Sequence, residues 1–197
     1  FQNPDDQIFS TRVFDEVAFG PRNLGYSDAE INTRVEEALA LVNLSKYQEL
    51  HPYDLTITER KLLCLASILA MQPEVIVLDE PTTAQDQMGV RQLGQIVSQL
   101  LASGKTVVTI THDMDFVAEF FNRTVVMRQG EVILDGPTPK VFNQPDVLMT
   151  TYVKPSAIAQ LAREVGAPEE VITVPDMVSW VSERVAAKKA LQDSSSK

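Results

Sequence analysis

Two neighbouring carboxylates follow a short apolar run in the middle of the chain. Residues 75–78 (VIVL) predict a strand buried on both faces, and Asp79 and Glu80 come directly after it. Open α/β sheets bind ligands at the carboxyl ends of their strands. Asp79 can therefore hold Mg²⁺, directly or through water, and Glu80 can orient an attacking water or take its proton. The alternative interpretation is a solvated acidic turn.

A histidine follows the next predicted strand. Residues 106–110 (TVVTI) predict a second buried strand, and Thr111, His112 and Asp113 come after it. We expect His112 to point into the same crevice as the two carboxylates, where it can donate a hydrogen bond to a γ-phosphate or help position water. The alternative is a histidine with a purely structural role at a strand end.

The elements around these residues predict an α/β fold with a mainly parallel sheet. Between the two strands, apolar residues recur at helical spacing from Val90 to Leu101, and Gly104 is expected to end that helix. A strand, a helix and a strand in this order imply parallel strands with a crossover helix. Residues 124–127 and 131–134 flank a Gln-Gly pair and predict an antiparallel hairpin.

A helical arm is predicted before this sheet, over about residues 10–72. A short helix is expected within residues 1–26, and Ser27 with Glu30 forms a capping box that starts the next helix. After a polar connection at 45–54, a further helix is predicted from about Glu59 to Ala70.

A break at Gly136-Pro137 separates the predicted ATPase region, 1–136, from a helical extension, 137–197. The extension is expected to contain helices punctuated by proline, at about 139–143, 156–165 and 176–191. The tail from Ser194 to Lys197 is expected to be frayed or disordered.

The composition narrows the function classes. The chain is 44% hydrophobic and 22% charged, which is typical of a globular protein, and its net charge of -10 argues against a general nucleic-acid binder. The single cysteine, Cys64, allows no disulfide within the chain and indicates a reducing compartment. No apolar run approaches the roughly 20 residues needed to span a bilayer, and no signal peptide opens the chain. Because the chain opens with Phe1, we expect it to begin inside a domain; a processed mature terminus is the alternative.

The order of these motifs resembles the nucleotide-binding subunits of ABC transporters. Gln2 matches the Q-loop, 75–80 the Walker B strand with its catalytic glutamate, 83–86 the D-loop with Asp86, and His112 the switch histidine. The resemblance covers roughly residues 1–136 and implies a fold like that of P-loop NTPases. It implies ATP and Mg²⁺ as ligands, with Glu80, His112 and Gln2 in catalysis and Asp79 and Gln2 at the metal.

A narrower resemblance is to the ATPases of energy-coupling factor transporters and cobalt importers. It rests on residues 2–9 (QNPDDQIF) and 17–21 (VAFGP), with Lys154-Pro155 in the extension also similar. It implies a transporter that imports a vitamin or a metal ion. In such a transporter this chain would pair with a second ABC ATPase subunit or domain, and the pair would lie beneath a transmembrane transporter protein. The expected location is cytoplasmic, on the inner face of the membrane, with no nucleic acid as partner.

Two features depart from the family pattern. The phosphate loop, G-x-x-x-x-G-K-[ST], is absent from the sequence, so we expect a truncated chain that is inactive alone. A natural pseudo-ATPase with a regulatory role is the rival, and an ABC ATPase of DNA repair or translation is a third possibility.

The second departure is the signature segment, which reads Leu55-Thr56-Ile57-Thr58-Glu59 where the family has Leu-Ser-Gly-Gly-Gln. The resemblance implies that Thr56, Thr58, Glu59 and Asp86 meet the nucleotide of the opposite subunit. Thr56 and Glu59 also form a capping box that would compete with a phosphate, and the added negative charge would repel it. This predicts an asymmetric pair, a heterodimer or a tandem; the alternative is a tolerated variant whose charge points away.

Overall fold

A computed structural model describes residues 4–195, which form two compact units. The first unit extends to Thr111 and the second begins at His112. Each unit is described by itself. The division into an ATPase region ending at 136 and an extension beyond it stays a prediction.

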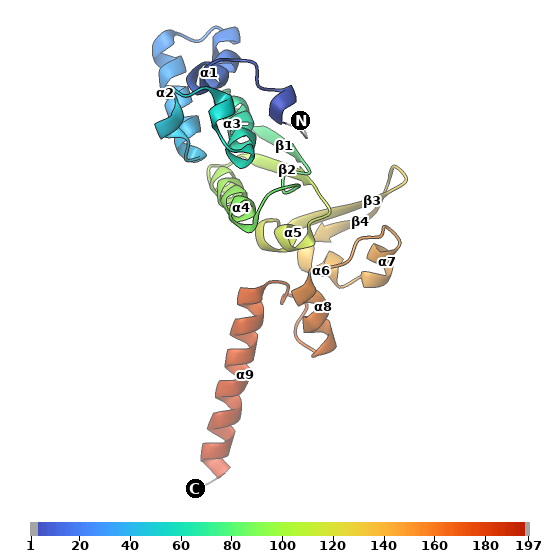
Figure 1. Ribbon diagram of the computed structural model, residues 1–197. Helices are drawn as coiled ribbons and strands as arrows, with labels where there is room; N and C mark the ends of the chain where they lie inside the picture. The colour runs from blue at the N-terminus through green and yellow to red at the C-terminus, as the bar shows by residue number, and fades with distance from the viewer. Residues whose placement is uncertain (1–3, 196–197) are drawn as a thin grey trace. The chain divides into compact units, whose positions relative to one another are not determined.

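The first unit begins with the helical arm (Figure 1). Its three α-helices are α1 (Val13–Asn23), α2 (Asp28–Leu41) and α3 (Ile57–Leu69), and its short 3₁₀ turns are η1 (Pro4–Asp6), η2 (Ser45–Tyr47) and η3 (Pro52–Asp54). The predicted capping box starts α2, because the Ser27 N–H donates to the Glu30 carboxylate at 2.9 Å and the Ser27 hydroxyl accepts from the Glu30 N–H. The helix predicted from about Glu59 is α3, which begins two residues earlier.

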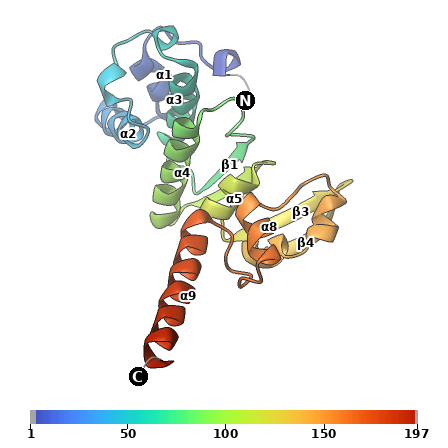
Figure 2. The ribbon, with the colours of Figure 1, turned by 60° about the horizontal axis from the view of Figure 1, so that its bottom comes forward.

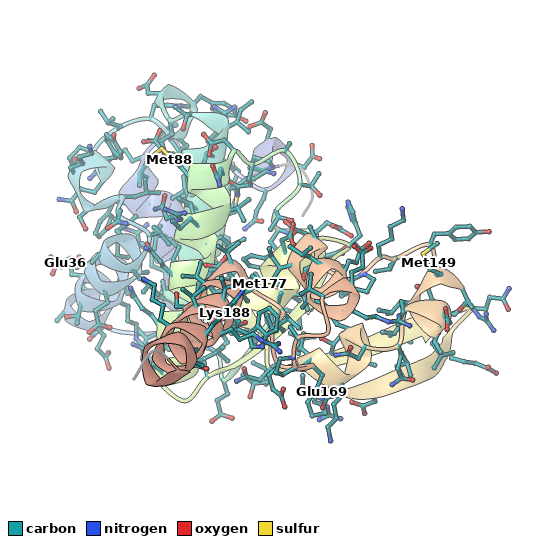
Figure 3. The ribbon with its side chains drawn as sticks, turned by 90° about the horizontal axis from the view of Figure 1, so that it is seen from below. Glu36, Met88, Met149, Glu169, Met177 and Lys188 are labelled. Atoms are coloured by element: carbon teal, nitrogen blue, oxygen red, sulfur yellow. The ribbon has the colours of Figure 1, made fainter. Side chains whose placement is uncertain are left out.

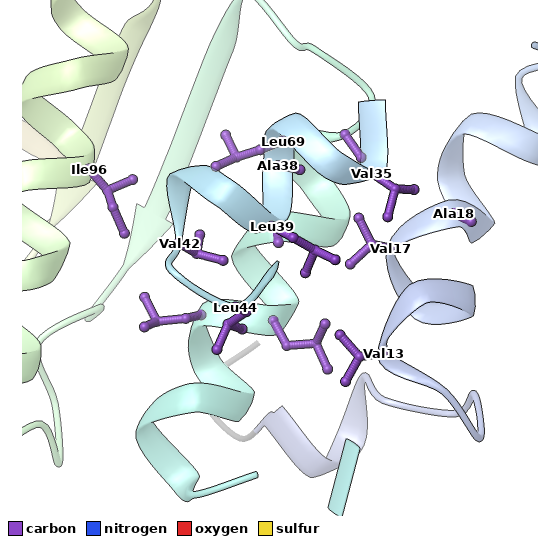
Figure 4. Close-up of a cluster of buried hydrophobic side chains, with 14 of the residues drawn as sticks. Val13, Val17, Ala18, Val35, Ala38, Leu39, Val42, Leu44, Leu69 and Ile96 are labelled. Carbon is purple, nitrogen blue, oxygen red and sulfur yellow. The ribbon is translucent and has the colours of Figure 1, made fainter. Parts of the chain in front are cut away.

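The arm has an apolar core of its own, built where its three helices meet (Figure 4). Val17 of α1, Val35 and Leu39 of α2 and Leu63 of α3 are fully buried in it. The helical spacing of these residues places them on the inner face of each helix. The core therefore fixes α3, which carries the signature segment, against the rest of the arm.

The predicted parallel pair of strands is confirmed. β1 (Val75–Asp79) pairs with β2 (Thr106–Ile110) in parallel, with Val75 opposite Thr106 and Asp79 opposite Ile110. The crossover between them is α4 (Gln87–Ala102), whose C-cap residue is Ser103. Gly104, which we expected to end the helix, follows Ser103 and has a φ of +82°. Figure 2 shows α4 beside β1 from a second direction.

The prediction that both strands are buried on both faces is wrong for the described residues. Ile76 is buried and Leu78 and Val107 are partly buried against the arm and α4, whereas Val77 and Ile110 on the opposite face are 61% and 55% exposed. Successive side chains of a strand point to opposite faces, and the helices of this unit cover only one of them.

The second unit contains a hairpin, several short helices and the long helix α9. Its elements are α5 (Met114–Phe120), β3 (Arg123–Arg128), β4 (Glu131–Pro137), α6 (Thr138–Phe142), α7 (Pro145–Met149), α8 (Ala157–Glu164) and α9 (Val174–Ser195). The predicted hairpin is confirmed: β3 and β4 are antiparallel, and both turn residues have positive φ, +52° at Gln129 and +84° at Gly130. Val126 of the hairpin shares a buried cluster with Phe142 and Leu148.

The helices predicted after the hairpin correspond to α6, α8 and α9, and α7 was not predicted. α9 includes Ser194 and Ser195, where we expected the tail to begin, and Ser196 and Lys197 lie outside the described residues. Within residues 4–195, no helix combines the length and apolar character that crossing a membrane requires.

Candidate functional site

Asp79 and Glu80 lie at the carboxyl end of β1, as predicted. Asp79 is the last residue of the strand, and the Glu80 N–H continues the pairing by donating to the Ile110 carbonyl at 2.8 Å. This bond anchors the backbone of both carboxylates to β2. The two side chains are thus presented at the edge where parallel sheets bind ligands.

The turn after β1 contains two residues in the left-handed backbone region. Glu80 has a φ of +46° and Ala84 a φ of +56°, and neither is glycine. Such conformations cost on the order of 1–3 kcal/mol each and cluster at functional sites. Hydrogen bonds across the turn, from the Thr83 N–H to the Glu80 carbonyl and from the Gln85 N–H to the Thr82 carbonyl, help to hold it. The D-loop position predicted from the resemblance is therefore an ordered, strained turn.

A cavity of about 160 Å³ lies beside the two carboxylates. Its polar lining includes Asp79, Glu80, Gln7 of the segment after η1, Lys61 of α3 and Gln85 of the turn. Within the first unit, the cavity therefore lies between the Walker B and D-loop positions and the part of α3 that follows the signature segment. Oxygen donors at its rim suit Mg²⁺, which is commonly held by one or two carboxylates together with phosphate and water.

Asp79 is suited to bind Mg²⁺ because its carboxylate offers oxygen ligands and because it lies at the carboxyl end of β1. In the part of the chain that the structure describes, no three or more His, Cys, Asp or Glu side chains gather into a metal cluster. Gln2, the other predicted metal residue, lies outside the described residues.

Asp86 caps the helix that follows the D-loop turn. Its carboxylate accepts a hydrogen bond of 2.7 Å from the Gly89 N–H at the start of α4. A Cβ on Gly89 would lie 3.2 Å from the Thr58 methyl carbon and 2.3 Å from the Gln85 amide oxygen. The start of α4 thus lies against the signature segment, and only glycine fits there without displacing these neighbours.

The signature segment forms the capping box that its sequence predicts. Both the N–H and the hydroxyl of Thr56 donate to the Glu59 carboxylate at 2.8 Å, and the Glu59 N–H donates back to the Thr56 hydroxyl at 3.2 Å. Thr58, partly buried, occupies the second position of the helix. The Glu59 charge therefore turns back onto the helix end, where the resemblance places a phosphate.

The surroundings of Glu59 favour its ionised form. The backbone N–H of Thr56 lowers the pKa of Glu59 most, and the hydroxyls of Thr56 and Tyr47 and the charge of Lys46 lower it further. Lys46 also lies over the Tyr47 ring, 4.6 Å from its centroid. This group of residues borders a second cavity, of about 250 Å³. The carboxylate is thus held as an anion by the chain's own groups.

His112 is the first residue of the second unit, and its side chain is exposed. The next residue, Asp113, caps α5 by accepting a hydrogen bond of 3.0 Å from the Phe116 N–H. The predicted approach of His112 to Glu80 stays a prediction.

Sequence reasoning missed a buried carboxylate next to the Q-loop position. Glu16 of α1 is 3% exposed and accepts hydrogen bonds from the N–H groups of Phe9 and Ser10, at 3.2 and 2.9 Å. The segment that follows η1 is thereby held to the arm. The sequence signal that could have indicated this burial is the position of Glu16 between the apolar residues Val13 and Val17 of the helix.

The sequence and the fold are similar to those of known ABC transporter proteins. Residues 1–83 match the family model described as ABC transporter. The energy-coupling factor transporter ATP-binding protein EcfA of Methanoculleus marisnigri is 44% identical over 164 residues, 83% of this chain and 59% of that protein. The solved structure of CbiO1 from Clostridium perfringens, part of an ABC transporter complex, superposes with a TM-score of 0.68 at 34% identity, covering 77% of this chain and 61% of that one.

The sequence is similar to ABC-type ATPases of the energy-coupling factor and cobalt type, and the predicted resemblance is confirmed. The α/β fold predicted from that resemblance is likewise confirmed. A relative in Methanosarcina acetivorans, described as a putative ABC transporter ATP-binding protein, is 43% identical over 188 residues, which are 93% of this chain but 31% of that relative. The chain thus spans only part of the curated relatives that it matches.

Proposed function

We propose that this chain is part of the ATP-hydrolysing subunit of an importer, which energises uptake through a membrane partner. The observation that carries the proposal is the pair Asp79 and Glu80 at the carboxyl end of β1, anchored to β2 beside a polar cavity. The similarity to energy-coupling factor ATPases supports the same function. Uptake of a vitamin or a metal ion is the transport that this similarity favours.

Catalysis in this proposal is positioning and charge stabilisation. Asp79 would hold Mg²⁺, and the bound ion would neutralise charge on the phosphates. Glu80 would polarise the attacking water. The hydrogen bond from its N–H to the Ile110 carbonyl holds the backbone that carries the carboxylate. His112 would contact the γ-phosphate, and Gln2 would link the metal and the water to the membrane partner.

The arm offers a surface for the membrane partner. Phe9 and Phe19 are 61% and 47% exposed, and their rings meet edge to face with centroids 4.7 Å apart. Exposed aromatic pairs are typical of protein interfaces. Phe9 lies in the segment that follows the Q-loop position, so a partner docked there would contact that segment. In this proposal the subunit would lie on the cytoplasmic face of the membrane.

A second ABC ATPase subunit or domain is the other proposed partner. Ile57, the first residue of α3, is 58% exposed, and Met88, in the first turn of α4, is 82% exposed (Figure 3). These apolar side chains flank the signature and D-loop positions, which the ABC arrangement turns toward the opposite subunit. Because Glu59 places a negative charge at the signature, an asymmetric pair, as a heterodimer or a tandem, is favoured over a homodimer.

One observation favours a different function, that of a regulatory pseudo-ATPase. The Glu59 carboxylate already accepts hydrogen bonds from the N–H and the hydroxyl of Thr56, so these donors are satisfied without a phosphate. Hydrolysis of Mg-ATP by the full-length gene product, alone and with its partner ATPase, separates the two functions. Turnover that depends on Glu80 supports the ATPase; ATP binding without turnover in every combination supports the regulator.

A further inference from the structure

Two adjacent basic residues follow the signature segment on α3 and contact two different loops. Arg60 reaches back toward the segment after the Q-loop position, and Lys61 reaches toward the D-loop turn. Neither residue belongs to the capping box that starts α3. The signature helix is therefore joined by side chains both to the segment after the Q-loop position and to the D-loop turn.

The Arg60 contact is an ion pair with Asp5 of η1. The Arg60 Nε lies 3.0 Å from the Asp5 carboxylate, and the Arg60 side chain is only 14% exposed. Its orientation is fixed from two other sides, because one terminal nitrogen donates to the Leu55 carbonyl at 2.8 Å and the guanidinium lies 5.6 Å from the centroid of the Tyr53 ring. A planar guanidinium held in this way has little freedom to release Asp5.

The Lys61 contact joins the same helix to the D-loop turn. The Lys61 ammonium donates to the Thr83 carbonyl, inside the turn whose residues Glu80 and Ala84 have positive φ. The packing of Thr58 against Gly89 forms a second link between the two segments. A shift of the signature helix would therefore pull on the turn that begins with Glu80.

We propose that Arg60 and Lys61 are positioning residues that couple the signature segment to the Q-loop segment and to the D-loop of the same subunit. The inference rests on the proposed function for the roles of those loops. The two contacts act separately, because Asp5 and Thr83 lie on different elements. Movement imposed on the Q-loop segment by a membrane partner would then reach the signature segment through Arg60, and Glu80 through Lys61.

Hydrogen exchange in the full-length gene product tests the two links one at a time. In Arg60→Met, we expect amides of residues 7–10 to exchange about tenfold faster, and those of 82–86 to be unchanged. In Lys61→Met, we expect the reverse. Matched controls are Arg34→Met and Lys105→Met, whose side chains donate to the Ala70 and Gln72 carbonyls elsewhere in the unit and should leave both segments protected.

Rescue and kinetics separate positioning from general stability. The charge-reversed double variant Asp5→Arg with Arg60→Asp should restore protection of residues 7–10. With Mg-ATP as probe, each single methionine variant should lower kcat about threefold to tenfold while KM stays within about twofold. Faster exchange in both segments and in α3 from each variant, no change in either segment, or failure of the rescue would overturn the inference. If the wild type hydrolyses no ATP, the proposed function fails, and the exchange pattern still decides the coupling.

Discussion

The Glu59 carboxylate accepts hydrogen bonds of 2.8 Å from both the backbone N–H and the hydroxyl of Thr56. The pair closes the first turn of α3 with a negative charge supplied by the chain. That end of a helix is positively polarised and is a ready site for an anion. A phosphate brought to the signature segment would thus compete with a carboxylate already in place, and the electrostatic consequences of this arrangement can be measured.

The stability of the fold should depend on the ionisation of Glu59. The pKa of Glu59 is lowered in the folded chain, first by the Thr56 N–H. The ionised side chain therefore adds to the free energy of unfolding above the ordinary pKa of 4.5, and this stabilisation is lost as the pH falls through the lower pKa of the folded chain. We expect the wild type to be more stable than Glu59→Gln at neutral pH, with the difference shrinking below pH 4.5. Urea unfolding across this range, with Glu36→Gln of α2 as an exposed control, measures it; a difference independent of pH would contradict it.

Repair of the signature should speed hydrolysis. The variant combines Thr56→Ser, Ile57→Gly, Thr58→Gly and Glu59→Gln in the full-length gene product with its partner ATPase. Removing a carboxylate from a partly dehydrated phosphate site relieves repulsion on the order of 1–4 kcal/mol, so we expect a rise in kcat/KM of at least about fivefold. Steady-state kinetics measure it, with the folded fraction matched by circular dichroism. A repaired enzyme that is no faster shows that the natural signature is competent and that the asymmetry argument is wrong.

Cys64 should be unreactive in the folded protein. Burial raises its pKa to about 11, with the charge of Glu16 adding to the effect, so almost no thiolate is present at neutral pH. A chromogenic disulfide reagent should react with Cys64 at least about a hundredfold more slowly in the folded protein than in the denatured protein. The rate in the folded protein should increase toward high pH. Equal rates in the two conditions would place Cys64 in a more open setting.

The arm core should be sensitive to the loss of Leu39. This residue of α2 is fully buried between α1 and α3, so Leu39→Ala should lower the free energy of unfolding by about 3 kcal/mol (Figure 4). Leu24, beyond the end of α1 and 57% exposed, gives a matched control whose alanine variant should change stability by less than about 0.5 kcal/mol. Similar losses in the two variants would contradict the packing described for the arm.

The sequence predicted the elements whose signals are local. The capping boxes at Ser27 and Thr56 and the Gln129-Gly130 hairpin depend on residues close together in the chain, and all are present. The parallel pair of strands, also present, was predicted from the strand–helix–strand order. The helix α7 was not predicted because it has only five residues and opens with Pro145, which also reads as a break. An apolar run could not reveal that the strands are covered on one face only, because that depends on which elements pack against them.

The contacts that organise the candidate site were beyond sequence reasoning. Arg60 and Asp5 lie on separate elements, and the arm must fold before their charges meet. The positive φ of Glu80 follows from the turn that leaves β1, whereas residue type would predict an ordinary backbone. The apolar run before Asp79 and Glu80 was enough to predict that both residues follow a strand of a parallel pair, which is the edge where such sheets bind ligands.

The central claim is that Glu80 activates water for ATP hydrolysis. In the full-length gene product with its partner ATPase, Glu80→Gln should lower kcat for Mg-ATP at least about a hundredfold, because it removes the carboxylate that polarises water. The Kd for Mg-ATP should stay within about twofold of the wild type, because Asp79 remains. Glu74→Gln, at the opposite end of the same strand and exposed, should hydrolyse ATP normally. Turnover by Glu80→Gln within a few-fold of the wild type would contradict the account.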